Sequence, residues 1–166
     1  MPKREVDIPV RLSLLDRLID ANPRVSTEPL LTRSKSLREL KTSLKRDLEW
    51  LLNTRRMIEQ EGTASVKDVQ RSLYGYGLPD ICSLSLHSNK DQNRLLRMIE
   101  SAVTTFEPRL AGVSVVMEPV GENARVLRFV ITGLLRIDPV PEPVSFDTVL
   151  EVPNGIYKVK GDASAG

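Results

Sequence analysis

Apolar residues recur with a helical period through the first two thirds of the chain. The clearest stripe consists of leucines spaced by three or four residues, the repeat of one helical face: Leu37, Leu40, Leu44, Leu48 and Leu51. Ser36 and Glu39 have the spacing of a capping box, so the pattern predicts a helix from Leu37 to about Gln60, with an earlier end near Asn53 as the alternative. The stripe is shorter than the three or four heptads of a coiled coil, so it indicates a domain core.

Three further helices and one turn are predicted by local signals. One of these helices is short and starts at Ser65-Val66-Lys67-Asp68, with Val66, Val69 and Leu73 on one side. Ser13 stands at the cap of a short helix, and Ser88 stands at the cap of a longer amphipathic helix. The longer helix must end before Pro108, because proline has no amide hydrogen and keeps the preceding residue out of helical geometry. Gly75 and Gly77 permit a sharp reversal, and no phosphate-loop lysine follows them, so they indicate a structural turn.

The apolar period changes from near 3.6 to 2 after Gly112. Alternating apolar and polar residues predict strands near 113–117, 127–137 and 144–152, and a short edge strand at 156–160. Helices therefore precede strands along the chain. This order predicts an α+β fold, with N-terminal helices packed on one face of a C-terminal three- to four-stranded antiparallel meander.

The two ends of the chain are polar and lack periodicity. We expect residues 1–12 to form a flexible N-terminal arm and residues 161–166 to form a disordered tail. Between them, residues 13–160 are expected to form a single domain, which agrees with a length of 166 residues.

Composition excludes several classes of protein. Hydrophobic residues make up 40% of the chain, enough for a buried core, and the formal charge of +2 is too even to indicate a nucleic-acid binder. One cysteine and one histidine allow neither a disulfide framework nor a Cys-based or multi-His metal site, so we expect no cofactor. The sequence has no apolar run of the ~18 residues that cross a bilayer and no apolar signal core, so we expect a cytoplasmic protein without direct membrane insertion.

Charge is unevenly distributed along the chain. The first 60 residues carry an excess of basic side chains, and the remainder carries a small excess of acidic ones. Solvated lysines and arginines on helices explain this distribution most simply. The alternative is that the N-terminal half faces an acidic partner.

The sequence does not supply the side chains of a recognisable active site. A serine hydrolase needs a base beside its nucleophile, but His87 is the only histidine and no Gly-x-Ser-x-Gly motif occurs. A glycosidase needs two carboxylates across a cleft, and spacing alone cannot pair candidates such as Glu100, Glu107 and Glu118. Recognition of nucleic acid would need aromatic residues interleaved with a basic patch, and the few aromatic residues are scattered.

One short segment combines a helix stop with opposite charges: Phe106-Glu107-Pro108-Arg109-Leu110. Proline fixes a backbone torsion here and thereby the directions of the flanking side chains, and arginine can bind a carboxylate through two parallel hydrogen bonds. The simplest interpretation is a helix stop with solvated charges. The functional alternative is a rigid polar elbow that docks on another protein, and an elbow neutralised inside its own chain would not present its charges to a partner.

Several segments, taken together, resemble a known family. In chain order they are Ser13-Leu14-Leu15-Asp16-Arg17-Leu18, Arg46-Asp47-Leu48-Glu49-Trp50-Leu51-Leu52-Asn53-Thr54-Arg55, Tyr76-Gly77-Leu78-Pro79-Asp80, Phe106-Glu107-Pro108-Arg109-Leu110 and the final strand pair. Over roughly residues 10–160, they resemble TssE, the baseplate subunit of type VI secretion systems. TssE is in turn similar to the small phage baseplate wedge proteins once labelled lysozyme-like.

The resemblance implies a non-enzymatic structural subunit of the type VI secretion baseplate. Members of the family contact the TssF and TssG subunits of the wedge, TssK indirectly, and the first ring of the contractile sheath made of TssB and TssC. Glu107, Pro108 and Arg109 are implied to dock on the core formed by TssF and TssG. The implied location is the cytoplasm of a Gram-negative bacterium, at the inner-membrane-associated secretion apparatus.

The resemblance also implies that the sheet accepts sheath strands by edge addition. This agrees with the unpaired amides and carbonyls that an exposed sheet edge offers. We place the contact in the segment 145–160 and expect four of its residues to take part: Phe146, Thr148, Leu150 and Tyr157.

Two other functions remain as alternatives. A peptidoglycan-hydrolysing, lysozyme-like enzyme would use Glu107 as its general acid, and a nucleic-acid binder would use the basic helical half, with affinity that falls steeply with salt. Under the leading hypothesis, reversing the charge of Arg109 abolishes wedge assembly and leaves folding intact.

Overall fold

The computed structural model describes residues 10–19, 32–56, 67–81, 84, 88–118 and 126–162. The chain divides into two units, residues 1–44 and residues 45–166, and each is described by itself. His87, most of the predicted arm and the last four residues of the predicted tail lie outside the described residues. Among the described helices, none is both long and apolar enough to cross a membrane.

The first unit contains α1 (Leu14–Leu18) and the start of α2 (Arg33–Asn53). Ser13 caps α1 as predicted, because its hydroxyl accepts a hydrogen bond from the Asp16 amide at 3.1 Å. The Asp16 carboxylate in turn accepts a hydrogen bond from the Ser43 hydroxyl of α2 at 2.6 Å. This contact joins the two helices within the unit.

The predicted start of α2 at Ser36 is wrong. Helix α2 begins at Arg33, and Ser36 lies fully buried inside its first turns. The hydroxyl of Thr32 accepts a hydrogen bond from the Lys35 amide at 3.4 Å and takes the capping role. The Ser36 hydroxyl instead accepts from the Val10 amide at 2.9 Å, which attaches the chain before α1 to α2.

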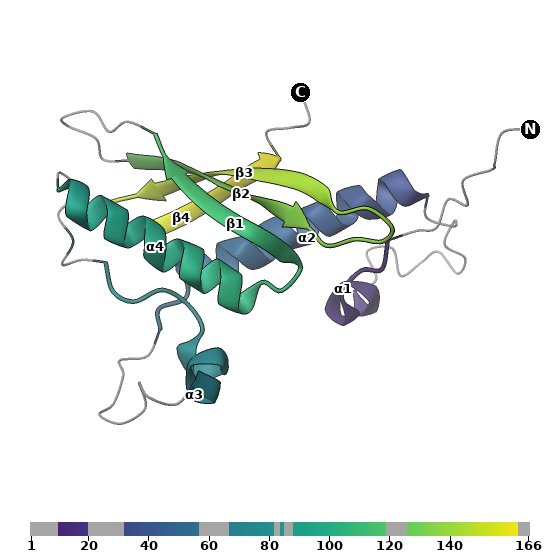
Figure 1. The fold of residues 1–166 in the computed structure, drawn as a ribbon, viewed down its shortest axis with the longest axis horizontal. Helices are drawn as coiled ribbons and strands as arrows, with labels where there is room; N and C mark the ends of the chain where they lie inside the picture. Colours follow the sequence, from purple (N-terminus) through teal and green to yellow (C-terminus); the bar gives the residue numbers. More distant parts are fainter. Residues whose placement is uncertain are drawn as a thin grey trace, which may run out of the picture. The chain divides into compact units, whose positions relative to one another are not determined.

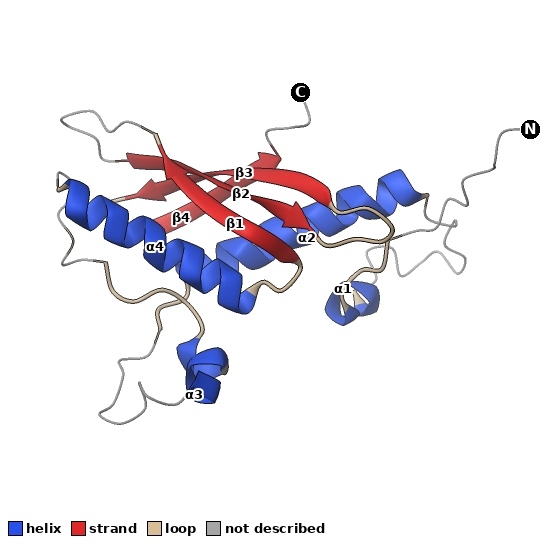
Figure 2. Ribbon diagram, in the orientation of Figure 1, coloured by secondary structure: helices blue, strands red, loops and turns tan. Residues whose placement is uncertain are grey.

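The helices of the second unit are the end of α2, α3 (Lys67–Arg71) and α4 (Asn89–Phe106), with a short 3-10 helix at Leu73–Gly75 (Figure 2). Helix α2 ends at Asn53, the earlier of the two predicted ends. Helix α4 is capped by Ser88 and stops at Glu107, as predicted from Pro108. In this unit the leucine stripe of α2 is buried as expected at Leu48 and Leu51. In the first unit its Leu40 and Leu44 are buried and Leu37 is half-buried.

Four antiparallel strands follow, in the spatial order β1 (Leu110–Met117), β2 (Val126–Leu135), β3 (Glu142–Glu151) and β4 (Ile156–Asp162) (Figure 1). Helices therefore precede a four-stranded meander, which confirms the predicted α+β fold. Strand β4 extends two residues beyond the predicted edge strand and takes up Gly161 and Asp162.

One face of the sheet is buried and the other faces solvent. The buried side chains alternate along the strands with the predicted period of two: Leu127, Phe129, Ile131, Leu135, Val144, Phe146, Leu150, Tyr157 and Val159. Within the second unit, the apolar sides of the helices complete this core: Leu48, Leu51, Leu52, Leu95, Ile99 and Val103. The opposite face carries exposed residues such as Val116, Arg128 and Leu134.

Both outer strands are closed in part by side chains from helices. On β1, the Val115 amide donates a hydrogen bond to the Glu100 carboxylate of α4 at 3.0 Å. On β4, the Asn53 side-chain amide pairs with the Tyr157 backbone, accepting from its N–H and donating to its C=O, each at 2.8 Å. Exposed edges pair readily with other strands, so Glu100 and Asn53 protect the sheet at these two points.

Candidate functional site

The elbow between α4 and β1 is formed by Glu107, Pro108 and Arg109. The Glu107 amide still bonds to the Val103 carbonyl at 2.9 Å, while the Glu107 carbonyl accepts from the Leu110 amide at 3.1 Å and closes a turn. The Arg109 carbonyl accepts from the Arg136 amide at 2.8 Å, which joins the elbow to the end of β2. Pro108 is exposed at the tip of this turn.

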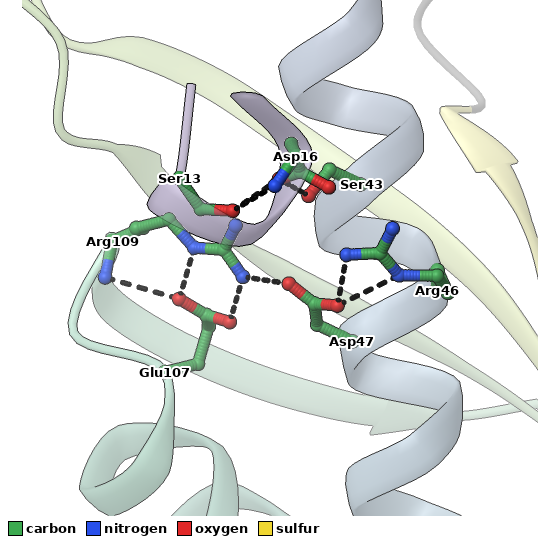
Figure 3. A network of polar contacts seen from close by, with 7 residues as sticks. All are labelled: Ser13, Asp16, Ser43, Arg46, Asp47, Glu107 and Arg109. Atoms are coloured by element: carbon green, nitrogen blue, oxygen red, sulfur yellow. Dashed lines mark hydrogen bonds and ion pairs between the residues drawn. The ribbon is translucent and has the colours of Figure 1, made fainter. Parts of the chain in front are cut away.

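The charged side chains of the elbow bind each other and α2 (Figure 3). The Arg109 guanidinium donates to both carboxylate oxygens of Glu107, at 2.6 and 2.5 Å, and to the Asp47 carboxylate at 2.6 Å. The Arg109 backbone amide also donates to Glu107 at 3.2 Å. The result is a two-pronged arginine–carboxylate pair extended by a second carboxylate, the geometry in which such pairs are strongest.

Aromatic and cationic groups surround this charge network. Arg46 binds the other oxygen of Asp47 at 2.8 Å and lies 5.0 Å from the ring of Trp50, in cation–π geometry. Tyr76 packs edge to face on Phe106, with 5.3 Å between ring centroids. Burial raises the pKa of Tyr76, and the negative charges of Asp47 and Glu107 raise it further.

The network determines the charge state of Arg109. Burial alone would lower the pKa of this guanidinium, but the hydrogen bonds and charges of Glu107 and Asp47 outweigh burial and raise its pKa above the usual value. Arg109 is therefore a permanent cation held between two carboxylates.

The functional interpretation of the sequence expected the elbow to present two opposite charges to a partner. In the structure these two charges bind each other. Glu107 is only 5% exposed and its carboxylate is engaged by Arg109, while Pro108 is exposed and Arg109 is half-buried. The expectation that charge reversal at Arg109 leaves folding intact conflicts with this geometry, because Arg109→Glu would leave Glu107 buried among like charges. Docking through the elbow itself stays a prediction.

The four residues expected to contact the sheath lie in the core. Phe146, Thr148, Leu150 and Tyr157 are each at most 2% exposed, so they offer no side chain to a partner. Strand β3 is paired on both sides, by β2 and by β4, so its edges cannot accept another strand. A sheath contact through this part of the sheet stays a prediction, and it would have to use the backbone of β4.

Two of the three carboxylates considered for a glycosidase are engaged within the fold. Glu100 accepts a hydrogen bond from the Val115 amide of β1 and Glu107 is bound by Arg109, whereas the Glu118 side chain is exposed. The described residues that line the two main clefts include none of the three. No group of acidic, histidine or cysteine side chains in the described part of the chain is arranged to hold a metal ion.

Sequence reasoning missed the structural roles of three residues: Asp47 at the elbow, and Glu100 and Asn53 at the edges of the sheet. Asp47 and Asn53 belong to a segment that the resemblance singled out, but their partners lie 62 and 104 residues away. Asp47 precedes Leu48 and so falls outside the leucine stripe, but the helical period does not indicate which residue it binds.

The sequence profile of the baseplate wedge protein gp25 family matches residues 38–140, more than half of the chain. The chain therefore belongs to the baseplate wedge protein gp25 family, and the resemblance found in the sequence is confirmed at this level. It is a structural baseplate subunit by family.

Comparison with solved structures and with curated proteins gave two further results. A chain in a structure described as the baseplate complex from the type VI secretion system is 21% identical in sequence, with a TM-score of 0.45. That match covers 66% of this chain and 93% of the other. No curated protein matches the sequence.

Proposed function

We propose that the protein is the TssE subunit of a type VI secretion baseplate and acts without catalysis. The observation that carries this proposal is membership of the baseplate wedge family, together with the order of the segments that resemble TssE. In this role the protein is cytoplasmic, at the inner-membrane-associated apparatus of a Gram-negative bacterium. It connects the TssF and TssG wedge core to the first TssB and TssC sheath ring, with TssK as an indirect neighbour.

The elbow is the proposed docking site for TssF and TssG. Glu107 acts as the buried positioning residue that holds Arg109, and the exposed Pro108 forms the tip that enters the partner. Arg109 and Asp47 keep 25% and 24% of their side chains exposed, so one side of the ion pair is available to a partner. The elbow then binds as a preformed shape, which lowers the entropic cost of association.

The proposed sheath contact is strand addition on the outer edge of β4. Asn53 occupies the outward backbone groups of Tyr157, so a sheath strand must pair beyond this point, toward the C-terminal end of β4. Main-chain hydrogen bonds would supply the affinity of such a contact. The proposed sheath-binding surface is therefore the backbone edge of β4, in place of the four buried side chains of β3 and β4.

The lysozyme-like alternative has weak support from the site. A general acid must reach the oxygen of its leaving group, and Glu107 is 5% exposed with its carboxylate bound by Arg109. We therefore expect the purified, folded chain to release no fragments from peptidoglycan. Turnover by the native chain that is lost in Glu107→Gln would contradict the structural role.

A steric block at the elbow tip tests docking while Glu107, Arg109 and Asp47 are all kept. Pro108→Arg places a long side chain on an exposed turn, so folding should be preserved while co-purification with TssF and TssG is lost. The matched control is Pro153→Arg, the same substitution at the exposed turn between β3 and β4.

The outcomes separate the family assignment from the docking site. Loss of TssF and TssG with Pro108→Arg, and retention with Pro153→Arg, supports docking through the elbow. Equal recovery with both variants contradicts the elbow as the site, and failure of the native chain to bind either subunit contradicts the proposed function as a whole.

A further inference from the structure

A groove along α4 has a basic rim. Its volume is about 830 Å³, and five cationic residues from three segments line it, here called the basic groove: Arg56, Arg71, Lys90, Arg94 and Arg97. The described residues that line the groove include no acidic side chain. The chain as a whole is nearly balanced in charge, so this concentration of positive charge is local.

The packing of α4 determines which side of the helix carries the basic residues of the groove. Lys90, Arg94 and Arg97 are spaced by four and three residues and lie along one exposed side of α4. The opposite side of the helix is held in the core by Leu95 and Ile99, so these three positions stay on the exposed side. No ion pair joins these three cations to an acid in the described part of the chain, which leaves their charge uncompensated there.

The remaining lining of the groove mixes apolar and polar residues. Pro79, Met98 and Phe106 supply apolar surface beside Gly75 and Gly77, and Gln70, Ser101 and Thr105 supply neutral polar groups. The glycine segment is fixed in place by backbone hydrogen bonds, from the Leu78 amide to Thr54 at 2.9 Å and from the Arg56 amide to Leu78 at 2.8 Å. The groove is therefore built on ordered backbone and has a shape before any partner arrives.

We propose that the basic groove binds an extended, acidic segment of another polypeptide. From Lys90 to Thr105 the helix rises about 22 Å at 1.5 Å per residue, which matches roughly seven residues of extended chain. Acidic side chains on one face of such a segment repeat every ~6.7 Å, close to the ~6 Å rise between Lys90 and Arg94. The apolar surface of Pro79, Met98 and Phe106 receives a single apolar residue between the acids.

The lining favours a polypeptide over a nucleic acid. Single-stranded nucleic acid is usually held by aromatic side chains on which bases stack. Phe106 is the aromatic residue among the described lining residues, and its ring already packs against Tyr76. This inference does not depend on the proposed baseplate function, since it uses only the groove.

Fluorescence anisotropy with a synthetic peptide tests the proposal on the full chain. The probe is a fluorescein-labelled peptide that alternates glutamate with alanine around a central leucine, and its counterpart carries glutamine in place of glutamate. The double variant Arg94→Glu/Arg97→Glu should lower affinity for the glutamate peptide by about tenfold or more, because like charges then face each other.

The matched control is Arg128→Glu/Arg136→Glu, which makes the same change of charge at two exposed positions outside the groove. Retained affinity in the control, loss in the groove variant and weak binding of the glutamine peptide support the proposal, provided that thermal unfolding shows both variants folded. Equal affinity of both double variants overturns it, as does no binding by the native chain at low salt. Tighter binding of an oligothymidine of equal charge also overturns it and assigns the groove to nucleic acid.

Discussion

Glu107 shows how a charged residue at a helix stop becomes part of the interior. Its carboxylate is 5% exposed, and an isolated carboxylate there would carry a desolvation cost of several kcal/mol. Arg109 offsets this cost with two side-chain hydrogen bonds and also binds Asp47 of α2. The elbow is therefore held by electrostatics as well as by proline.

Reversing the charge of Arg109 should destabilise the fold. Arg109→Glu removes the partner of a buried carboxylate, and we expect the free energy of unfolding to fall by about 2–3 kcal/mol. This is below the cost for a fully buried pair, because Arg109 keeps 25% of its side chain exposed. Urea denaturation followed by circular dichroism measures the change, with exposed Arg128→Glu as the control. Equal stability of the two variants would contradict the network.

Removing the hydroxyl of Tyr157 should stabilise the protein. This hydroxyl is buried and has no hydrogen-bond partner among the described residues. Tyr157→Phe removes an unsatisfied polar group, so the free energy of unfolding at pH 7 should rise by about 1 kcal/mol. Thermal unfolding measures the difference, and a loss of stability at neutral pH would show that the hydroxyl is satisfied.

The same substitution should change the response to alkaline pH. Burial raises the pKa of Tyr157 above its usual 10.0, so the folded state resists ionisation of this group. The stability that results is fully present below pH 10 and is lost as the pH rises through the higher folded pKa. Tyr157→Phe should therefore fall less steeply in stability above pH 10 than the native chain, and parallel curves would contradict this.

At the scale of elements, the sheet could be predicted more fully than the long helix. Strand alternation directly gives the buried face, because a change of one position moves every side chain to the other side. The start of α2 could not be predicted from its capping signal, because Thr32 and Ser36 both carry a hydroxyl that can cap a helix. Only the burial of Ser36 in the folded chain distinguishes the two.

The candidate site could be predicted only in its local part. The sequence identified the turn at Pro108 and the two charges beside it. It could not show that Asp47 lies across from Arg109, because 62 residues separate them. Contacts of this separation depend on how α2 and α4 pack, which no local pattern specifies.

The turn at Gly77 should tolerate no side chain. Its φ is +102°, and a Cβ atom there would lie 2.3 Å from the Thr54 carbonyl oxygen. Gly77→Ala should lower the free energy of unfolding by about 2–3 kcal/mol through backbone strain and displacement of the paired segment. Gly161→Ala is the control, since nothing lies within 4 Å of its added Cβ. Chemical denaturation compares the two, and equal effects would contradict this account.

At the scale of the whole molecule, both edges of the sheet are partly covered by side chains of the chain itself. Glu100 and Asn53 each satisfy outward backbone groups on an outer strand. These contacts limit strand pairing between copies of the chain at the two positions. The remainder of the β4 edge stays open to a partner strand.

Opening both edges should make the protein self-associate. The double variant Glu100→Ala/Asn53→Ala exposes the Val115 amide and the backbone of Tyr157, so strands from different copies can pair. Sedimentation velocity should show concentration-dependent dimers or larger species that the native chain does not form at the same concentration. Glu118→Ala, which removes an exposed carboxylate outside these contacts, should behave like the native chain. An unchanged sedimentation profile of the double variant would contradict edge protection.

The contact between Arg46 and Trp50 gives the molecule an intrinsic optical reporter. Trp50 is the only tryptophan in the chain and is 54% exposed, and its ring faces the guanidinium that binds Asp47. Its emission should therefore shift when the polarity around Asp47 changes. Occupation of the elbow by another subunit could then be followed in real time by ultraviolet fluorescence, without an attached dye.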